Sequence, residues 1–337
     1  RSVLHVLSGR DMNGLSHELQ EPVAEMLGVP RQDSRQRVEA LMGDYFPHPR
    51  AVASALVWTR KVARPPAPIT EPGPVTQNVA VAADGIRFVD PVKAVGQPAW
   101  WLEAFEVAIA NGYPVSDEVR NCIQENVGRY AADYFMANEE GRLRLRAMLY
   151  PRPGLSARLA DMLECGLLGT IFPEFEKIHC RVIRDFYHKY TVDEHTLIAI
   201  RHLEAMRHPS SAGRARFASI LNEVHAPELL VLALLYHDTG KWREGDHANE
   251  SARLAGAMLA RLQLPDAARD TIEFLITHHL AISNVMFRRD VSDPDTAAEL
   301  AALVGNEELL KMLCLLTLVD IDAVAPGTLT PWKEDLL

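Results

Sequence analysis

The sequence lacks the features that mark membrane, secreted and disulfide-linked proteins. Its longest uninterrupted apolar run, at residues 229–236, has eight residues, whereas a membrane-spanning helix needs about 20. The four cysteines (Cys122, Cys165, Cys180 and Cys314) lie far apart and form no CxxC pair, which predicts reduced thiols. A secretory signal consists of a basic segment, an apolar segment and a cleavage site in that order, and the N-terminus does not show this order. We therefore expect a cytoplasmic protein without a membrane partner.

Basic charge is also scarce. The 337 residues include 35 Lys and Arg against 45 Asp and Glu, a net charge of −10, and no basic stripe stands out. Because nucleic-acid binding depends largely on basic surfaces, we expect no nucleic acid as a partner. The hydrophobic share of 48% and the charged share of 24% are typical of a folded globular chain. The chain begins at Arg1, so we expect it to be an excerpt of a longer protein.

A strand pattern occurs at one place only. Alternating runs surround Asp84-Gly85 in VAVAADGIRFVD, and an Asp-Gly pair in this setting is a strong signal for a β-hairpin. A cluster of prolines precedes it and predicts an extended linker, because proline cannot continue a helix. These prolines are Pro65, Pro66, Pro68, Pro72 and Pro74.

Helical spacing of apolar residues dominates the rest of the chain. Residues 19–62 predict short helices with breaks at Pro30 and Pro47, and Ser116 is a predicted N-cap. After Thr191, helices are expected at 193–207, 214–223, 227–237, 247–262, 266–280, 294–303 and 306–322. The predicted fold class is mainly α. Residues 1–98 form a helical region and a proline-rich linker with a hairpin, residues 99–180 a helical connecting region, and residues 181–337 an all-α bundle.

One histidine-aspartate pair stands out among the 13 histidines. His237 and Asp238 directly follow the apolar run at 229–236, so both side chains are expected at the buried end of a helix. Burying an ionisable pair costs free energy unless something compensates it. An imidazole and a carboxylate side by side suit a divalent cation better than one lone ligand does. The pair therefore predicts a metal site.

Further histidines and an aspartate lie beside other apolar helical runs: His195, His247, the pair His278-His279, and Asp320. Helices of a bundle can direct such side chains to one point in its core. A single histidine on an apolar helix face is more often an ordinary core residue, but this ordered set favours metal ligands. Asp322 competes with Asp320, but it lies two residues further along the helix and points to a different face. Asp320 is therefore the predicted ligand.

The order of these residues resembles that of the HD superfamily of metal-dependent phosphohydrolases, a helical family named for a doublet that stands here as His237-Asp238. Three segments resemble the HD domain of the bifunctional PII uridylyltransferase/uridylyl-removing enzyme family: DFYHKYTVDEHTLIAI at 185–200, YHDTGKWREGDHANESARLA at 236–255 and LTLVDIDAVAPGTLTPWKEDLL at 316–337. Segments upstream resemble those that join the family's nucleotidyltransferase domain to its HD domain: LHVLSGR at 4–10, VEALMGDYF at 38–46, IRFVDP at 86–91 and LECGLLGTIFPEFEKIHC at 163–180.

The resemblance implies a set of metal ligands. The four ligands common to HD domains are matched by His195, His237, Asp238 and Asp320, and the additional histidines of two-metal members by His247 and His278. His279 stays an alternative to His278, because adjacent helical residues point about 100° apart. Mg²⁺ or Mn²⁺ is the implied ion, one or two per chain, ahead of iron.

The implied activity is hydrolysis of a phosphodiester, namely the removal of uridylyl groups from a tyrosine of the PII nitrogen-signalling protein, with UMP as product. Asp238 and Lys241 are the predicted catalytic residues: Asp238 bridges two ions, and Lys241 stabilises a phosphoryl oxygen. The family's nucleotidyltransferase and ACT domains would lie before Arg1 and after Leu337.

Three alternatives stay open at this point. One is a general HD nucleotide phosphohydrolase or phosphodiesterase. The sequence Thr239-Gly240-Lys241 after the doublet is closer to that of such enzymes than to the Ile-Ala-Lys frequent in the uridylyl-removing family. Another is a regulatory HD module that binds without turnover. The third is a di-iron oxygenase.

Overall fold

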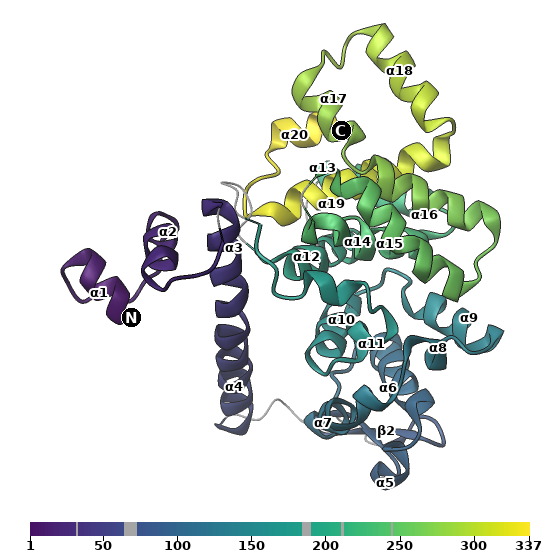
Figure 1. Ribbon diagram of the computed structural model, residues 1–337. Coiled ribbons are helices and arrows are strands. Elements are labelled where there is room, and N and C mark those ends of the chain that lie inside the picture. Colours follow the sequence, from purple (N-terminus) through teal and green to yellow (C-terminus); the bar gives the residue numbers. More distant parts are fainter. Residues whose placement is uncertain (32, 64–72, 184–189, 210–211, 244) are drawn as a thin grey trace.

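The computed structural model describes residues 1–337 apart from 32, 64–72, 184–189, 210–211 and 244. The fold is mainly α, as predicted, with one small sheet (Figure 1). One cluster of buried hydrophobic side chains extends from Val79 to Leu329 and joins the sheet, the middle helices and the C-terminal bundle. The division of the chain at residues 98 and 180 stays a prediction.

The N-terminal helices stand beside the rest of the chain (Figure 1). They are α1 (Ser2–Ser8), α2 (His17–Met26), α3 (Ser34–Tyr45) and α4 (Pro47–Ala63). The predicted breaks are confirmed, because Pro30 lies between α2 and α3 and Pro47 is the first residue of α4. Proline is well tolerated at a first helical position, where its missing N–H has no helical partner to lose.

The predicted hairpin is also confirmed. It consists of β2 (Val79–Ala82) and β3 (Gly85–Phe88), in antiparallel register with Ala82 opposite Gly85. Gly85 has a φ of +129°, and a Cβ at this position would lie 2.3 Å from the Pro114 carbonyl oxygen. Glycine is therefore required at the start of β3.

A third strand, β1 (Gly73–Pro74), pairs with β2 and was not anticipated, because it lies at the end of the proline cluster. The other four prolines of that cluster lie outside the described residues, so the extended linker is not tested there.

Short helices connect the sheet to the bundle. They are α5 (Pro91–Ala94), α6 (Pro98–Asn111), α7 (Asp117–Asn126), η1 (Val127–Arg129), α8 (Ala132–Phe135), α9 (Glu139–Met148), α10 (Leu155–Glu164), α11 (Leu167–Ile171) and η2 (Phe175–Ile178). Ser116 caps α7 as predicted, since its side chain accepts a hydrogen bond from the Val119 N–H.

The C-terminal bundle contains the seven helices expected from apolar spacing: α12 (Val192–Ala205), α13 (Ala212–Glu223), α14 (Pro227–Tyr236), α15 (His247–Leu262), α16 (Asp266–His278), α18 (Pro294–Val304) and α19 (Glu307–Val324). Three short elements were not anticipated: η3 (Thr239–Trp242), α17 (Ala281–Arg288) and α20 (Pro331–Leu336). Within the described part of the chain, no single helix has the length and apolar composition to cross a membrane, although the bent pair Gly213–Glu223 and Pro227–Trp242 meets both criteria together.

Helix α14 forms the centre of the bundle and is surrounded by α12, α15, α16 and α19. Its residues from Leu230 to Tyr236 are almost completely buried, and each buried leucine stabilises the fold by about 1.5–3 kcal/mol. The C-terminal end of α14 therefore lies at a fixed point deep in the bundle.

Candidate metal centre

The His237-Asp238 pair lies at the buried C-terminal end of α14, as expected. The two residues are 0% and 1% exposed. The chain then turns through η3, where the Gly240 N–H donates to the Ser251 Oγ at 2.8 Å. This packing of η3 on α15 holds the pair beside His247, the first residue of α15.

Two backbone carbonyls fix the orientation of two histidines. The Nδ1 of His237 lies 2.7 Å from the Leu234 carbonyl oxygen, and the Nδ1 of His279 lies 2.7 Å from the Ile276 carbonyl oxygen. Because a carbonyl oxygen only accepts, each Nδ1 carries the hydrogen, and the Nε2 of the neutral imidazole keeps its lone pair. Both rings therefore direct a potential metal-binding nitrogen into the bundle.

His195 from α12, His237 and Asp320 from α19 form an inner group. The Asp320 Oδ1 lies 2.8 Å from the His195 Nε2 and 3.5 Å from the His237 Nε2. The donor atoms of all three residues lie within 4.8 Å of one another. This spacing brings two imidazoles and a carboxylate from three separate helices to one point.

Asp238, His247 and His279 form an outer group, again with donor atoms within 4.8 Å of one another. The two Nε2 atoms of His247 and His279 are 3.3 Å apart, and the Asp238 Oδ1 lies 3.7 Å and 3.9 Å from them. The other oxygen of Asp238, Oδ2, lies 3.3 Å from the His237 Nε2 of the inner group. Asp238 thus connects the two groups.

These contacts fit a divalent cation. Among the described residues, the buried His237 Nε2 and Asp238 Oδ1 have no hydrogen-bond partner, and an unsatisfied buried polar atom costs about 1–3 kcal/mol. In the outer group, the lone pair of the His279 Nε2 faces the Asp238 carboxylate and the His247 imidazole. A cation between these three side chains would accept that lone pair. Each group offers two imidazoles beside one carboxylate, a donor set less suited to Mg²⁺, which prefers oxygen ligands, than to a transition metal.

The pKa shifts of the centre follow from burial and charge. Burial alone lowers the pKa of His237, but Asp238 and Asp320 outweigh it and raise this pKa to about 10. Burial would raise the pKa of the Asp320 carboxyl, yet His195 and His237 hold it well below its usual value. In the outer group, burial and the charge of His237 lower the pKa of His279 to about 4. A proton and a cation therefore compete for the inner group, whereas His279 is already in its neutral, ligating form.

Lys241 lies beside the pair on η3. Its ammonium nitrogen is 2.7 Å from the Asp238 Oδ2, so it neutralises part of the carboxylate charge. A cavity of about 10 Å³, close to the volume one water needs, adjoins this contact and is lined by Ile183, Tyr190, Val192, His195, Asp238 and Lys241.

Of the two adjacent histidines left open by the sequence, the structure places His279 in the outer group. The ring of His278 instead packs against Phe274, with ring centroids 4.8 Å apart, and His278 belongs to neither group. The buried face of α16 carries Ile272 and Ile276, and His279 continues that face. Asp322 also lies apart, as expected: it forms ion pairs with His202 and Arg214, each at 2.9 Å.

A third group of residues of metal-ligand type, His179, Cys180 and Asp193, is in contact with the side chain of Arg50. The Arg50 guanidinium from α4 donates to the fully buried Asp193 carboxylate at 2.8 Å and to the Cys180 Sγ at 3.3 Å. Burial raises the pKa of the Cys180 thiol. The guanidinium of Arg50 thus balances the negative charge of the Asp193 carboxylate. All four cysteines of the chain are free thiols.

A buried ion pair beside the centre was not predictable from the pattern of the sequence. The Glu174 carboxylate accepts hydrogen bonds from the Tyr236 hydroxyl at 2.7 Å and from the Arg261 guanidinium at 2.7 and 2.8 Å. Burial alone would raise the pKa of Glu174, but Arg261 and Tyr236 outweigh it and lower this pKa. Since Tyr236 directly precedes His237, the contact of Glu174 with Tyr236 links the connecting region to the C-terminal end of α14. Its only signal in the sequence is an acidic residue in the apolar stretch IFPEF.

Glu174→Gln is expected to lower the free energy of unfolding at pH 7 by roughly 1–3 kcal/mol, because it weakens these charge-assisted bonds. The folded pKa lies below the usual 4.5, so the carboxylate contributes fully above that pH, and its contribution is lost as the pH falls through the folded pKa. Urea unfolding at pH 7 and pH 3 measures the difference. The gap should shrink at pH 3, and a constant gap contradicts the assignment. Glu125→Gln, at an exposed site, is the control.

Comparisons with known proteins give one consistent result. A family model described as GlnD PII-uridylyltransferase matches residues 1–57. Over its whole length, the chain is similar to proteins named bifunctional uridylyltransferase/uridylyl-removing enzyme: it is 32% identical to the one from Ruegeria pomeroyi, 31% to that from Cereibacter sphaeroides and 30% to that from Ectopseudomonas mendocina. The chain spans only 37–38% of the length of these curated relatives.

Proposed function

The chain belongs to the family of bifunctional uridylyltransferase/uridylyl-removing enzymes, and from that premise we propose that its C-terminal bundle is the uridylyl-removing hydrolase. The reaction is hydrolysis of the phosphodiester between a uridylyl group and a tyrosine of the PII signalling protein, with UMP as product. One observation carries this proposal: the two oxygens of the buried Asp238 face two separate groups of histidine ligands. Paired metal sites of this kind suit phosphoester hydrolysis.

Each residue of the centre has a defined part in the proposal. His195, His237 and Asp320 would hold one cation, and Asp238, His247 and His279 would hold a second. A bound divalent cation lowers the pKa of a water ligand to about 7 and neutralises charge on phosphoryl oxygens. The carbonyls of Leu234 and Ile276 keep the His237 and His279 rings in the ligating tautomer.

Lys241 is the proposed phosphoryl-binding residue. Its ammonium lies 2.7 Å from the Asp238 Oδ2, on the wall of the small cavity beside the inner group. It donates to a phosphoryl oxygen that enters this cavity and adds a fixed positive charge there. Of the ions expected for the family, the imidazole-rich donor set supports Mn²⁺ ahead of Mg²⁺.

The direct test uses the purified chain, Mn²⁺ and uridylylated PII protein, with release of UMP as the readout. A panel of free nucleotides and cyclic dinucleotides in the same assay tests the general phosphohydrolase alternative. UMP release from the protein substrate supports the proposal. A chain that binds Mn²⁺ but releases no UMP would overturn it.

His279→Ala is expected to reduce bound Mn²⁺ from about two ions per chain to about one, because the outer group loses an imidazole that no neighbour replaces. His278→Ala is the matched control, since its ring packs against Phe274 outside both groups. Metal content after dialysis measures both variants. Loss of metal from the His278 variant alone would contradict the assignment.

A further inference from the structure

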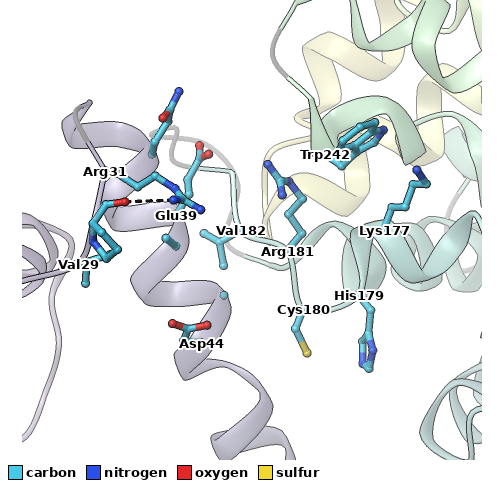
Figure 2. A pocket seen from close by; sticks show the side chains of 14 residues that line it. Val29, Arg31, Glu39, Asp44, Lys177, His179, Cys180, Arg181, Val182 and Trp242 are labelled. Carbon is cyan, nitrogen blue, oxygen red and sulfur yellow. Dashed lines mark hydrogen bonds between the residues drawn. The ribbon is translucent and has the colours of Figure 1, made fainter.

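A second pocket, larger than the cavity at the metal centre, lies between the N-terminal helices and the start of the bundle. Its volume is about 560 Å³, within the range of small-molecule sites. One wall is α3, and the other is the segment at residues 177–182 together with Trp242 (Figure 2). None of the residues that line this pocket belongs to the inner or the outer group of the metal centre.

The bundle side of this pocket carries positive charge, and the part of the chain that the structure describes supplies no carboxylate in an ion pair with it. Arg181 is half-buried, and its Nε donates to the Lys241 carbonyl oxygen at 3.1 Å. Among the described residues, Glu39 is the carboxylate whose charge acts on it. Burial lowers the pKa of Arg181, and the charge of Glu39 only partly offsets this. The Lys177 ammonium lies 4.4 Å from the centre of the Trp242 ring. A half-buried guanidinium without a carboxylate in an ion pair is a receptor for an anion such as phosphate.

The opposite wall carries two carboxylates, Glu39 and Asp44 of α3, together with the guanidinium of Arg31 (Figure 2). Glu39 also forms an ion pair with Arg35 at 2.9 Å. A ligand that fits both walls therefore has an anionic end for Arg181 and hydrogen-bond donors, such as hydroxyl or N–H groups, at its other end. A mononucleotide has this distribution, with its phosphate at one end and ribose hydroxyls and base N–H groups at the other.

The pocket and the metal centre share a wall. Val182 and Trp242 line the pocket, while their chain neighbours Ile183 and Lys241 line the small cavity beside His195 and Asp238. The hydrogen bond from Arg181 to the Lys241 carbonyl crosses this wall. An anion held by Arg181 would thus lie next to the backbone of the residue whose ammonium contacts Asp238.

We propose that this pocket is a mononucleotide-binding site, in which Arg181 and Lys177 bind the phosphate and the acidic wall of α3 binds the nucleoside. The choice of a uridine nucleotide rests on the proposed function, whose product is UMP. Bound there, the product contacts both α3 and the segment beside the metal centre, and so links the N-terminal helices to the hydrolase.

The test measures UMP binding to the metal-free chain in EDTA by isothermal titration calorimetry, with inorganic phosphate and uridine as separate probes. UMP should bind more tightly than either fragment, and Arg181→Gln should weaken it at least about tenfold. Lys177→Gln is a second variant for the case that Arg181→Gln does not fold, and Arg129→Gln, at an exposed site, is the control.

The outcomes separate this proposal from the proposed function. If inorganic phosphate binds as tightly as UMP, the pocket is a simple anion site and the nucleotide proposal fails. If UMP binding is absent, or is unchanged in both pocket variants, the proposal also fails, even where UMP release from uridylylated PII is intact. If UMP binds through Arg181 but no hydrolysis occurs with metal, the pocket stands and the hydrolase assignment fails.

Discussion

Asp238→Asn is expected to abolish uridylyl removal and to lower metal binding at both groups at once. The carboxylate oxygens of Asp238 face His237 on one side and His247 and His279 on the other. The amide keeps the shape of the side chain but removes its charge and replaces one acceptor oxygen by a donor. Loss of residues that merely support metal ligands costs 10- to 100-fold in affinity or activity, so loss of Asp238, the ligand proposed to be shared, should cost more than about 100-fold.

Metal content after dialysis and UMP release with Mn²⁺ measure the two effects in one preparation. Asp322→Asn is the control, because it makes the same chemical change on α19 in a residue paired with His202 and Arg214. Circular dichroism checks that the Asp238 variant is folded. Turnover within tenfold of the unmodified chain would refute the assignment of Asp238 as the bridging ligand.

Gly240→Ala is expected to give the largest loss of stability of any single-methyl change near the centre. A Cβ on Gly240 would lie 2.2 Å from the His247 carbonyl oxygen and 2.7 Å from the Ser251 backbone nitrogen. Both are backbone atoms, so η3 and α15 must move apart, which typically costs 1–3 kcal/mol. That movement also separates Asp238 from His247, so metal binding in the outer group should fall.

Gly256→Ala on the same α15 is the matched control. No atom lies within 4 Å of the Cβ that it adds, and alanine in a helix is favoured over glycine by about 0.5–1 kcal/mol. Urea unfolding at pH 7 should therefore place the two variants on opposite sides of the unmodified chain. A Gly240 variant as stable as the unmodified chain would contradict the close packing of η3 on α15.

Residues of the candidate metal centre were predictable from the sequence where ionisable side chains lie directly beside an apolar helical run. His237 and Asp238 directly follow the buried residues 229–236 of α14. Burying such an ionisable pair costs enough free energy to indicate a compensating partner. Asp320 could be separated from Asp322 because helical geometry places them on different faces. The hairpin was predictable from local turn chemistry, although its two-residue loop is Ala83-Asp84 rather than a turn centred on Asp84-Gly85.

Other features depend on contacts that sequence spacing does not encode. The choice of His279 over His278 follows from the carbonyl of Ile276 and the packing of Phe274, both of which are local to the folded helix. The ion pair between Glu174 and Arg261 and the pocket beside Arg181 join segments that are far apart in the chain. The short helices α17 and α20 were missed because few residues define their apolar faces.

The salt bridge between Arg50 and Asp193 has a consequence for any shortened form of this chain. Asp193 is fully buried and lies two residues before His195, and its counter-ion comes from α4. Cutting away the N-terminal helices would strand a negative charge inside the protein, which typically costs 3–5 kcal/mol. In a chain cut back to the C-terminal bundle, Asp193→Asn is therefore expected to raise the free energy of unfolding, which urea unfolding of the two shortened forms measures.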